Sequence, residues 1–316
     1  MKNSETQTGK ANKIFTVVNP VSAGGKTGKK WPVYRNNFHE EGIKLDIVKT
    51  GYPGQATTLV KEALSTGYRD IMAVGGDGTV NEVVNGFFSR GELINPHVRL
   101  IIFSLGSGSD YIKTLGITND INNIIEIINN GYRDYIDLGL ACYINNEGVK
   151  ENRYFVNIAD SGIGGVTVFN QRSKKLGGLM SYLFAALKTL LNYKNKRYKL
   201  VIDNKKILHR KISSVFVANG KYFAGGMKIA PEANLKDGKF NVIILGDLKK
   251  GETILNLYKA YTGNHLSHPK VKVVSAKQIS INSKERVLLE IDGEAVGRLP
   301  AKFTILKHKL PVLICG

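Results

Sequence analysis

The stretch IMAVGGDGTVNEVVNG, residues 71–86, joins an apolar run to a helical pattern through a turn of three glycines and one acid. The apolar run at 71–74 predicts a buried strand, and the valines that follow predict a helix. The amides of Gly75, Gly76 and Gly78, with the positive end of that helix, predict a phosphate site. Asp77 is suited to hold a Mg²⁺ whose other ligands are phosphate oxygens. The alternative is a plain turn in which Asp77 or Thr79 caps the helix.

Apolar runs and helical patterns alternate along the first half of the chain. We expect strands at 14–18, 45–48, 71–74 and 100–103, and helices at 33–42, 55–66, 79–88 and 119–130. This alternation predicts an α/β domain built on a parallel sheet. From about residue 139 the pattern favours a second, mostly antiparallel domain, with strands at 153–158, 198–202, 207–218, 239–245, 271–281, 287–291 and 303–307.

Two more glycine-rich stretches follow predicted strands of the first half. They are NPVSAGGKTG at 19–28 and LGSGSD at 105–110. Because ligands of open parallel sheets bind at the carboxyl ends of the strands, we expect all three loops to border one crevice. Neither stretch has the spacing of a Walker A or a Rossmann motif.

The charge of the chain is concentrated in its second half. The 316 residues carry 45 Lys plus Arg and 26 Asp plus Glu, and 42% of them are hydrophobic, which is typical of a folded protein of two domains or one large domain. Residues 1–150 are nearly neutral, so the whole excess falls on residues 151–316. Such an asymmetry indicates a partner that is anionic: a nucleic acid, a phosphorylated ligand or a membrane surface.

The cysteines and the apolar runs bear on the compartment. Cys142 and Cys315 form neither a disulfide framework nor a zinc pattern, so a reducing cytoplasm is the default expectation. The N-terminus lacks the apolar core of a signal peptide, and no run reaches the ~18 apolar residues that a membrane span needs. We therefore expect a cytoplasmic protein whose membrane contact, at the inner face, is peripheral.

Residues 172–211 form a strongly basic region. They hold twelve Lys or Arg and one acid, Asp203, and they flank an amphipathic helix expected at 176–191. A leucine-rich helix between basic ends suits an anionic bilayer. The alternative is that the leucines pack on the core of the second domain and the lysines lie on an ordinary surface. The chain has no recognised nucleic-acid module, so we expect no nucleic-acid partner.

Six motifs in this order resemble the soluble bacterial diacylglycerol kinase family, lipid kinases whose catalytic domain is shared with sphingosine and ceramide kinases. They are NPVSAGGKTG (19–28), GGDGTVNEVVNG (75–86), LGSGSD (105–110), DLG (137–139), APEANLKDGKF (230–240) and IDGEAVGRLPAKF (291–303). The chain departs from the family in the third motif, where Ser104, Ser107 and Ser109 replace Pro, Thr and Asn. Ser107 keeps a hydroxyl, whereas Ser109 removes an amide.

The resemblance implies an α/β fold class with two domains. An N-terminal α/β ATP-binding catalytic domain with a parallel sheet would span 14–138, with 308–316 returning to it. A mostly antiparallel, β-sandwich-like lipid-binding domain would span 139–307. The resemblance implies ATP as phosphate donor together with Mg²⁺. The nucleotide-binding residues would be Asn19, Pro20, Val21, Ser22, Ala23, Thr50, Gly75, Gly76, Asp77, Gly78, Thr79, Val80, Asn81 and Ser107.

The resemblance also implies roles for acids. Glu294, in the triplet Asp292-Gly293-Glu294, would be the catalytic base, and Asp77 would act beside it by holding the catalytic metal. From spacing alone the triplet is a hairpin turn with a solvated Glu294. A structural Mg²⁺ would be held by Asn234, Asp237 and Lys239, the last through a backbone oxygen. From their places at predicted strand or loop ends near the crevice, and not from the resemblance, we expect Asp110 and Asp137 to order the site; either could instead cap a helix.

These implications lead to one expected function with two alternatives. We expect an ATP- and Mg²⁺-dependent lipid kinase that phosphorylates a membrane lipid, with diacylglycerol as acceptor and phosphatidic acid as product. An NAD kinase-like enzyme with a soluble substrate is the first alternative. A non-catalytic protein that binds anionic surfaces is the second. A homodimer stays open, since an exposed edge strand would permit one.

Overall fold

The computed structural model describes residues 12–106, 108–172 and 192–315. The helix expected at 176–191, and Ser107, lie outside the described residues. The chain divides into two compact units, one formed by Met1–Ile136 with Leu310–Gly316 and one formed by Asp137–Lys309. These limits fall close to the expected ones, and the ATP-binding and lipid-binding roles of the two domains stay predictions.

Unit 1, the segments Met1–Ile136 and Leu310–Gly316, is built on a parallel sheet with strand order β6-β3-β1-β2. The strands are β1 (Ile14–Val18), β2 (Leu45–Lys49), β3 (Asp70–Gly75) and β6 (Arg99–Ser104), and a short pair is formed by β4 (Phe88–Ser89) and β5 (Glu92–Leu93). The end of β17 (Glu294–Ile314) joins the sheet beside β6, in parallel, through Val312 and Leu100. The predicted α/β class is thereby confirmed.

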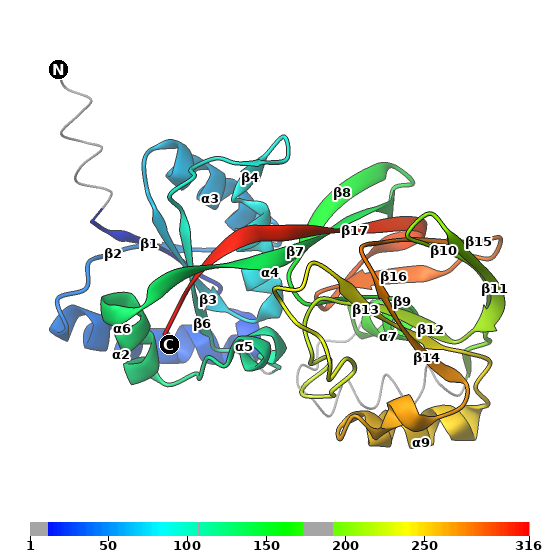
Figure 1. Cartoon of the computed structure of the whole chain (residues 1–316). Helices are drawn as coiled ribbons and strands as arrows, with labels where there is room; N and C mark the ends of the chain where they lie inside the picture. The colour runs from blue at the N-terminus through cyan, green and yellow to red at the C-terminus, as the bar shows by residue number, and fades with distance from the viewer. Residues whose placement is uncertain (1–11, 107, 173–191, 316) are drawn as a thin grey trace. The chain divides into compact units, whose positions relative to one another are not determined.

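Helices cover both faces of this sheet (Figure 1). They are α2 (Lys26–Glu40), α3 (Gln55–Ser65), α4 (Asp77–Asn85), α5 (Asp110–Leu115) and α6 (Ile121–Asn130), and the 3-10 turn η1 (Ser22–Gly25) precedes α2. α3 packs with α4, and α2 packs with α6. The sequence pattern predicted that this first helix would start at residue 33. That start is wrong, since α2 begins at Lys26 and contains Pro32.

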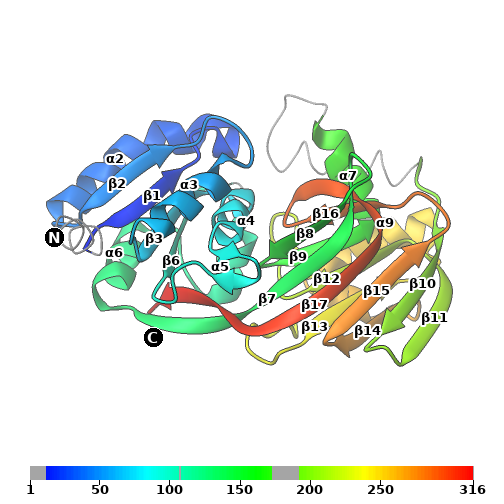
Figure 2. The same ribbon diagram turned by 90° about the horizontal axis from the view of Figure 1, so that it is seen from above.

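Unit 2, Asp137–Lys309, is mostly antiparallel (Figure 2). Its strand order is β14-β13-β12-β9-β16-β17, and β7, β8, β10, β11 and β15 extend the pairing. The bounds are β7 (Tyr132–Asn145), β8 (Lys150–Phe155), β9 (Ile158–Gly162), β10 (Lys196–Ile202), β11 (Lys206–Ile212), β12 (Ser214–Ala218), β13 (Phe240–Leu245), β14 (Val271–Ala276), β15 (Gln278–Ser283) and β16 (Leu288–Ile291). Among the described residues, this unit also has the helices α7 (Ile163–Arg172) and α9 (Lys250–Ala260) and the 3-10 turn η2 (Asn264–Ser267).

Three segments that the pattern predicts as single strands each form two. The run at 153–158 breaks because the amides of Val156 and Asn157 donate to the Asp292 carboxylate at 2.8 and 3.0 Å. The run at 271–281 breaks at Lys277, whose amide donates to Asp203. The run at 207–218 breaks at Ser213. At each break, a backbone amide that leaves the strand pairing donates to an acceptor far away along the chain.

Aromatic packing fills the core of unit 2. Phe155 stacks on Phe240 with ring centroids 5.5 Å apart, and Phe303 meets Phe155 edge-on. The glycine of the DLG motif lies under this cluster, because a Cβ at Gly139 would stand 2.2 Å from the Phe155 ring. Gly139 of the DLG motif is therefore needed for the close packing of Phe155. None of the described helices is long and apolar enough to cross a membrane.

Candidate functional site

The three glycine-rich loops of unit 1 follow β1, β3 and β6, which are neighbours in the parallel sheet. Asn19, directly after β1, donates from Nδ2 to the Thr79 hydroxyl at 3.1 Å, and its own amide donates to Val74 at 2.9 Å. The first and second loops are thus joined by hydrogen bonds. The carboxyl ends of adjacent parallel strands carry ligand sites, and the first turn of α4 begins at the same edge with Asp77.

The second and third loops approach each other closely through their backbones. A Cβ at Gly106 would lie 2.5 Å from the Cα of Gly76, a distance that no side chain tolerates. The Leu105 amide also donates to the Gly75 carbonyl at 2.7 Å. Glycine at position 106 is therefore required by the close approach of two backbones. Through these contacts the structure brings together the loops that the sequence predicted to share one crevice.

Replacing Gly106 with alanine should displace one of these two loops. We expect unit 1 to lose about 1–3 kcal/mol of stability from the overpacked contact and nucleotide affinity to fall with it. Thermal unfolding and equilibrium binding of ATP would measure both effects. Gly251→Ala is the matched control, since its Cβ would meet nothing within 4 Å. Equal melting temperatures and equal ATP affinities of the two variants would contradict the requirement for glycine at position 106.

The first loop, residues 19–28, folds tightly after β1. The Ser22 hydroxyl donates to the Asn19 carbonyl at 3.0 Å and to the Thr27 hydroxyl at 2.6 Å. Ala23 adopts a left-handed conformation, with φ of 52°, at the start of a run continued by two glycines. The predicted residues Pro20 and Val21 stand beside it, and the Val21 side chain is exposed. Pro20 packs so closely on Gly28 that a Cβ there would lie 2.9 Å from the Pro20 carbonyl oxygen.

Asp77 is partly buried and holds the start of α5. Its carboxylate accepts from the amides of Asp110 and Tyr111 at 3.1 and 3.3 Å. The alternative in which Asp77 or Thr79 caps α4 is wrong, because Gly76 is the N-cap and no side chain caps that helix. Asp77 thus joins the second loop to the third.

The acids around Gly108 suit a Mg²⁺ ion in their chemistry. Oxygens of Asp77 and Asp110 lie 3.6 and 3.5 Å from the point where a Gly108 Cβ would stand. Mg²⁺ is usually bound by one or two carboxylates plus substrate phosphates. Asp110 is buried and pairs with Lys113 at 2.9 Å. These donors fit a metal that phosphate oxygens complete, although no group of three or more His, Cys, Asp or Glu with metal-site geometry occurs among the described residues.

The remaining predicted nucleotide residues of unit 1 differ in what they can offer. Val80 and Asn81 are fully buried, and the Val80 amide already donates to the Gly76 carbonyl at 3.1 Å. Thr50 follows β2 and donates its amide to the Val18 carbonyl at 2.9 Å. Glu82, within the same motif, accepts the amides of Gly54 and Ala56 at the start of α3. This structural role accounts for the presence of Glu82 in the motif, with no need for Glu82 to bind a ligand.

In unit 2, Asp292 and Gly293 form the turn between β16 and β17. Both have positive φ, 47° and 86°, as the Asp-Gly pair of a tight hairpin requires. The buried Asp292 carboxylate accepts three amides, from residues 156, 157 and 158, at 2.8 to 3.1 Å. The turn is therefore fixed on both sides, and Glu294 begins the outgoing strand.

Glu294 is not the solvated residue that spacing alone suggests. Its Oε2 accepts from the Arg153 guanidinium at 2.8 Å, and the two side chains are only 28% and 17% exposed. Burial of Arg153 disfavours its charge, but the Glu294 carboxylate outweighs this and raises the pKa of Arg153. Sequence reasoning missed Arg153, which lies 141 positions away along the chain.

Two further acids beneath this turn were also missed. Asp160 on β9 and Glu290 on β16 are register partners, and both are fully buried. Asp160 accepts from the Ser214 hydroxyl at 2.6 Å, and Glu290 accepts the Gly293 amide of the turn at 2.5 Å. Burial raises the pKa of Asp160 to about 7. Burial and the Asp160 charge raise the pKa of Glu290 well above its usual range.

These two acids should make folding stability depend on pH. Their pKa values are higher in the folded state than in the unfolded chain, so the folded state retains protons that the unfolded chain releases from about pH 4 upward. Stability should therefore fall as pH rises through about 7. Urea midpoints between pH 5 and 8 would measure this slope. Glu290→Gln should make the dependence of stability on pH less steep, whereas Glu232→Gln, at an exposed position, should leave it unchanged. Parallel curves for the wild type and both variants would show that Glu290 does not cause the pH dependence.

The predicted structural metal loop is an exposed turn in unit 2. Asn234 and Asp237 each use Oδ1 to accept the amide two residues on, from Lys236 and Lys239, at 3.0 and 2.9 Å. One carboxylate, one amide oxygen and backbone oxygens are donors that fit Mg²⁺. Asp137 holds this turn by accepting the Gly238 amide at 2.6 Å.

Asp137 itself was expected to order the crevice of the nucleotide domain. That expectation is wrong, because its carboxylate accepts the amides of Gly238 and His308, which belong to unit 2.

The described part of the basic region 172–211 is mainly the β10–β11 hairpin. Two of its lysines form ion pairs, Lys196 with Glu285 at 3.2 Å and Lys211 with Asp247 at 3.3 Å. The role of the region toward a membrane stays a prediction.

Comparison with known proteins finds matches to two domain families. The model of the diacylglycerol kinase catalytic domain matches residues 13–141. The model of the YegS C-terminal NAD kinase beta sandwich-like domain matches residues 159–314. Residues 13–141 match a diacylglycerol kinase catalytic domain, and the chain is a kinase. The alternative of a non-catalytic binding protein is therefore not supported.

Individual relatives agree with these matches. A diacylglycerol kinase of Staphylococcus haemolyticus (strain JCSC1435) is 29% identical over 298 residues, covering 94% of this chain and 86% of that protein. A solved structure of a diacylglycerol kinase from Bacillus anthracis str. Sterne has a TM-score of 0.66 at 20% identity and covers 96% of this chain and 97% of its own. Yeast NADH kinase in complex with NADH has a TM-score of 0.52 at 10% identity, and the match covers 96% of this chain and 84% of the yeast chain. At these identities the solved structures show a shared fold alone.

Proposed function

We propose that this kinase transfers the γ-phosphoryl group of ATP to the hydroxyl of diacylglycerol, giving phosphatidic acid and ADP. The observation that carries the proposal is the joining of three glycine-rich loops at one edge of the parallel sheet of unit 1. Phosphoryl transfer needs little covalent work from a protein, and it depends on positioning and charge neutralisation. A backbone-lined edge at the start of a helix supports the donor half of this reaction.

The donor would be held by the loops around Asn19, Gly76 and Gly106. Their backbones approach so closely that phosphate oxygens could reach amides without meeting side chains. Asp77 and Asp110 would hold Mg²⁺, which supplies charge neutralisation at the phosphates when bound. Asn234, Asp237 and the backbone of Lys239 would hold a second, structural Mg²⁺.

Glu294 would accept the proton of the acceptor hydroxyl. As the hydroxyl oxygen forms its bond to the γ-phosphorus, the bond to the ADP oxygen breaks and the proton passes to the Glu294 carboxylate. Arg153 orients this carboxylate through the 2.8 Å ion pair. The hairpin turn of Asp292 and Gly293 fixes where it stands.

An apolar cavity in unit 2 supports a lipid as acceptor. It has a volume of about 70 Å³, well above the ~10–15 Å³ that one water needs. Asn256 lines it and is buried, and neither polar atom of its amide has a hydrogen-bond partner within the described structure. The first carbons of an acyl chain would fill the apolar part, and the ester carbonyl beside them would accept a hydrogen bond from Asn256 Nδ2. The lining also includes Ile163, Thr167, Phe216, Phe223, Met227, Ile229, Leu245, Leu257 and His265.

The decisive experiment is phosphate transfer from γ-labelled ATP with Mg²⁺ to diacylglycerol in mixed micelles. Phosphatidylglycerol, a sphingoid base, NAD and NADH are run in parallel, the last two because of the shared fold with NADH kinase. Label in phosphatidic acid is the expected result. Label in another lipid would replace the acceptor and keep the mechanism, and label only in NAD or NADH would overturn the lipid assignment.

A further inference from the structure

The outward face of α9 is apolar. At 100° per residue, the buried positions Thr253, Asn256 and Ala260 fall on one side of this helix. The opposite side carries Ile254, Leu255 and Tyr258, which are 41%, 55% and 78% exposed. A helix on the surface of a soluble domain usually presents polar residues there. The face is therefore unpartnered within the described chain.

Lysines border this apolar face. Lys250 lies on one edge of the helix face and Lys259 on the other, and Lys249 precedes the first turn. An apolar face between basic edges is the pattern of helices that lie in the surface of an anionic bilayer. Sequence reasoning placed such a helix at 176–191 and did not predict α9 at all.

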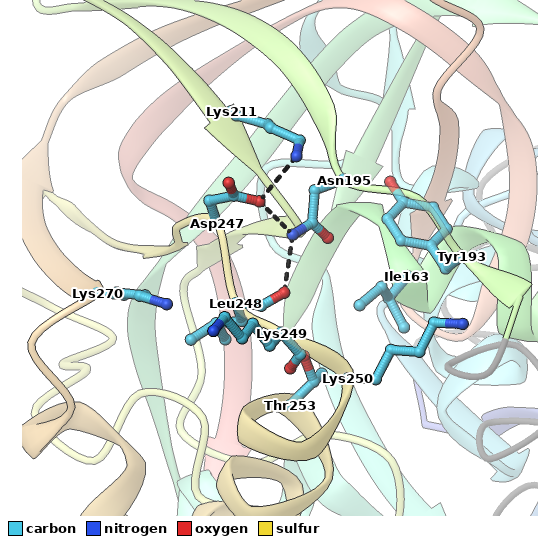
Figure 3. Close-up of a pocket in the computed structure, with 10 residues that line it drawn as sticks. All are labelled: Ile163, Tyr193, Asn195, Lys211, Asp247, Leu248, Lys249, Lys250, Thr253 and Lys270. Atoms are coloured by element: carbon cyan, nitrogen blue, oxygen red, sulfur yellow. Dashed lines mark hydrogen bonds and ion pairs between the residues drawn. The ribbon is translucent and has the colours of Figure 1, made fainter.

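A basic pocket adjoins the start of α9 (Figure 3). It has a volume of about 320 Å³, and four lysines line it against a single acid, Asp247. Figure 3 shows the Lys211 and Asn195 side chains reaching Asp247, at 3.3 and 2.8 Å, so this acid is already engaged. Its pKa is lowered, first by the hydrogen bond from Asn195. The lining residues are Ile163, Tyr193, Asn195, Lys211, Asp247, Leu248, Lys249, Lys250, Thr253 and Lys270.

The second nearby acid is engaged as well. Glu252 accepts from Lys270 at 2.8 Å and from the Lys249 amide at 2.6 Å. Lys249 and Lys250 are both exposed and bring two further positive charges to this pocket. Lysine side chains bind phosphate groups as point charges, so a phosphate is an anion that this pocket suits in charge.

We propose that α9 and this pocket form a docking surface for a bilayer that contains anionic phospholipids. Ile254, Leu255 and Tyr258 enter the interfacial layer, and the lysine pocket takes a lipid phosphate. A second copy of the chain is a poorer occupant, because it would bring the same lysines toward one another. The surface does not depend on the proposed reaction, since neither ATP nor an acceptor takes part in docking.

The test is sedimentation of the full-length protein with vesicles, without ATP. Vesicles of phosphatidylcholine alone are compared with vesicles of phosphatidylcholine and phosphatidic acid. Two double variants are used, Lys249→Gln with Lys250→Gln, and Leu255→Ser with Tyr258→Ser. Lys211 and Lys270 are left in place so that Asp247 and Glu252 keep their partners. Lys277→Gln with Lys302→Gln, which removes two exposed lysines outside the pocket, is the matched control.

We expect the wild type and the control to bind the anionic vesicles alike, and each test variant to bind about tenfold more weakly. Circular dichroism spectra and melting temperatures should be unchanged, since every replaced side chain is exposed. Equal binding by all variants, or an equal loss in the control, would overturn the proposal. So would binding of soluble glycerol phosphate but not vesicles, or a wild-type dimer that Leu255→Ser with Tyr258→Ser dissolves without changing vesicle binding.

Discussion

Replacing Glu294 with glutamine is expected to lower turnover by about 10²- to 10⁴-fold, the usual contribution of a positioned general base. Glutamine keeps the size of the side chain and an oxygen that can accept from Arg153, but it cannot take up the acceptor proton. The hairpin should persist, because Asp292 and Gly293 set its geometry. Initial rates with saturating ATP, together with a melting curve, would measure the change.

The control for this prediction is Glu285→Gln. Glu285 also pairs with a basic residue, Lys196, but its side chain is 43% exposed, so the loss of its charge should cost little. Its turnover should stay close to that of the wild type. A Glu294→Gln protein that turns over normally would remove the base assignment and leave Glu294 as the partner of Arg153.

Asp77→Asn should lower turnover by about 10²-fold or more, because the variant loses the charge that would hold the metal at the phosphates. Asp77→Ala should lose as much activity and, in addition, about 0.5–2 kcal/mol of stability, since it removes the acceptor for the first amides of α5. The two variants thus separate the chemical role from the structural one. Rates and urea unfolding on the same preparations would measure both.

Asp120→Ala provides the comparison for the structural part. Asp120 is the N-cap of α6 and accepts the Asn122 amide. Its loss should lower stability and leave turnover per folded molecule intact. If Asp77→Ala behaved like Asp120→Ala, the Asp77 carboxylate would be a helix cap without a part in catalysis.

Three strands of unit 1, β1, β3 and β6, could be predicted because each is a short apolar run that is almost completely buried. β1 matches its expected limits, and β3 and β6 extend theirs by one residue at each end. The crevice followed from the same logic, since parallel strands end at a common edge. Local pattern and tertiary structure agree there.

Unit 2 was predicted less well because its features depend on distant partners. The break at Val156 requires Asp292, which is not visible from the residues around it. Asp160 and Glu290 lie in strands where a carboxylate normally marks the solvent face, and only the pairing of β9 with β16 shows that both are buried. α9 was missed because apolar residues on its outward side obscure the helical period.

The late position of β17 along the chain has a consequence for the order of folding during synthesis. β6 gains its outer neighbour only from the last residues of β17, through Val312 and Leu100. The ribosome therefore releases all of residues 137–309 before unit 1 can close its sheet, so the unit that begins first finishes last. Until then β6 presents an open edge, which is the part of a nascent chain most exposed to wrong pairing.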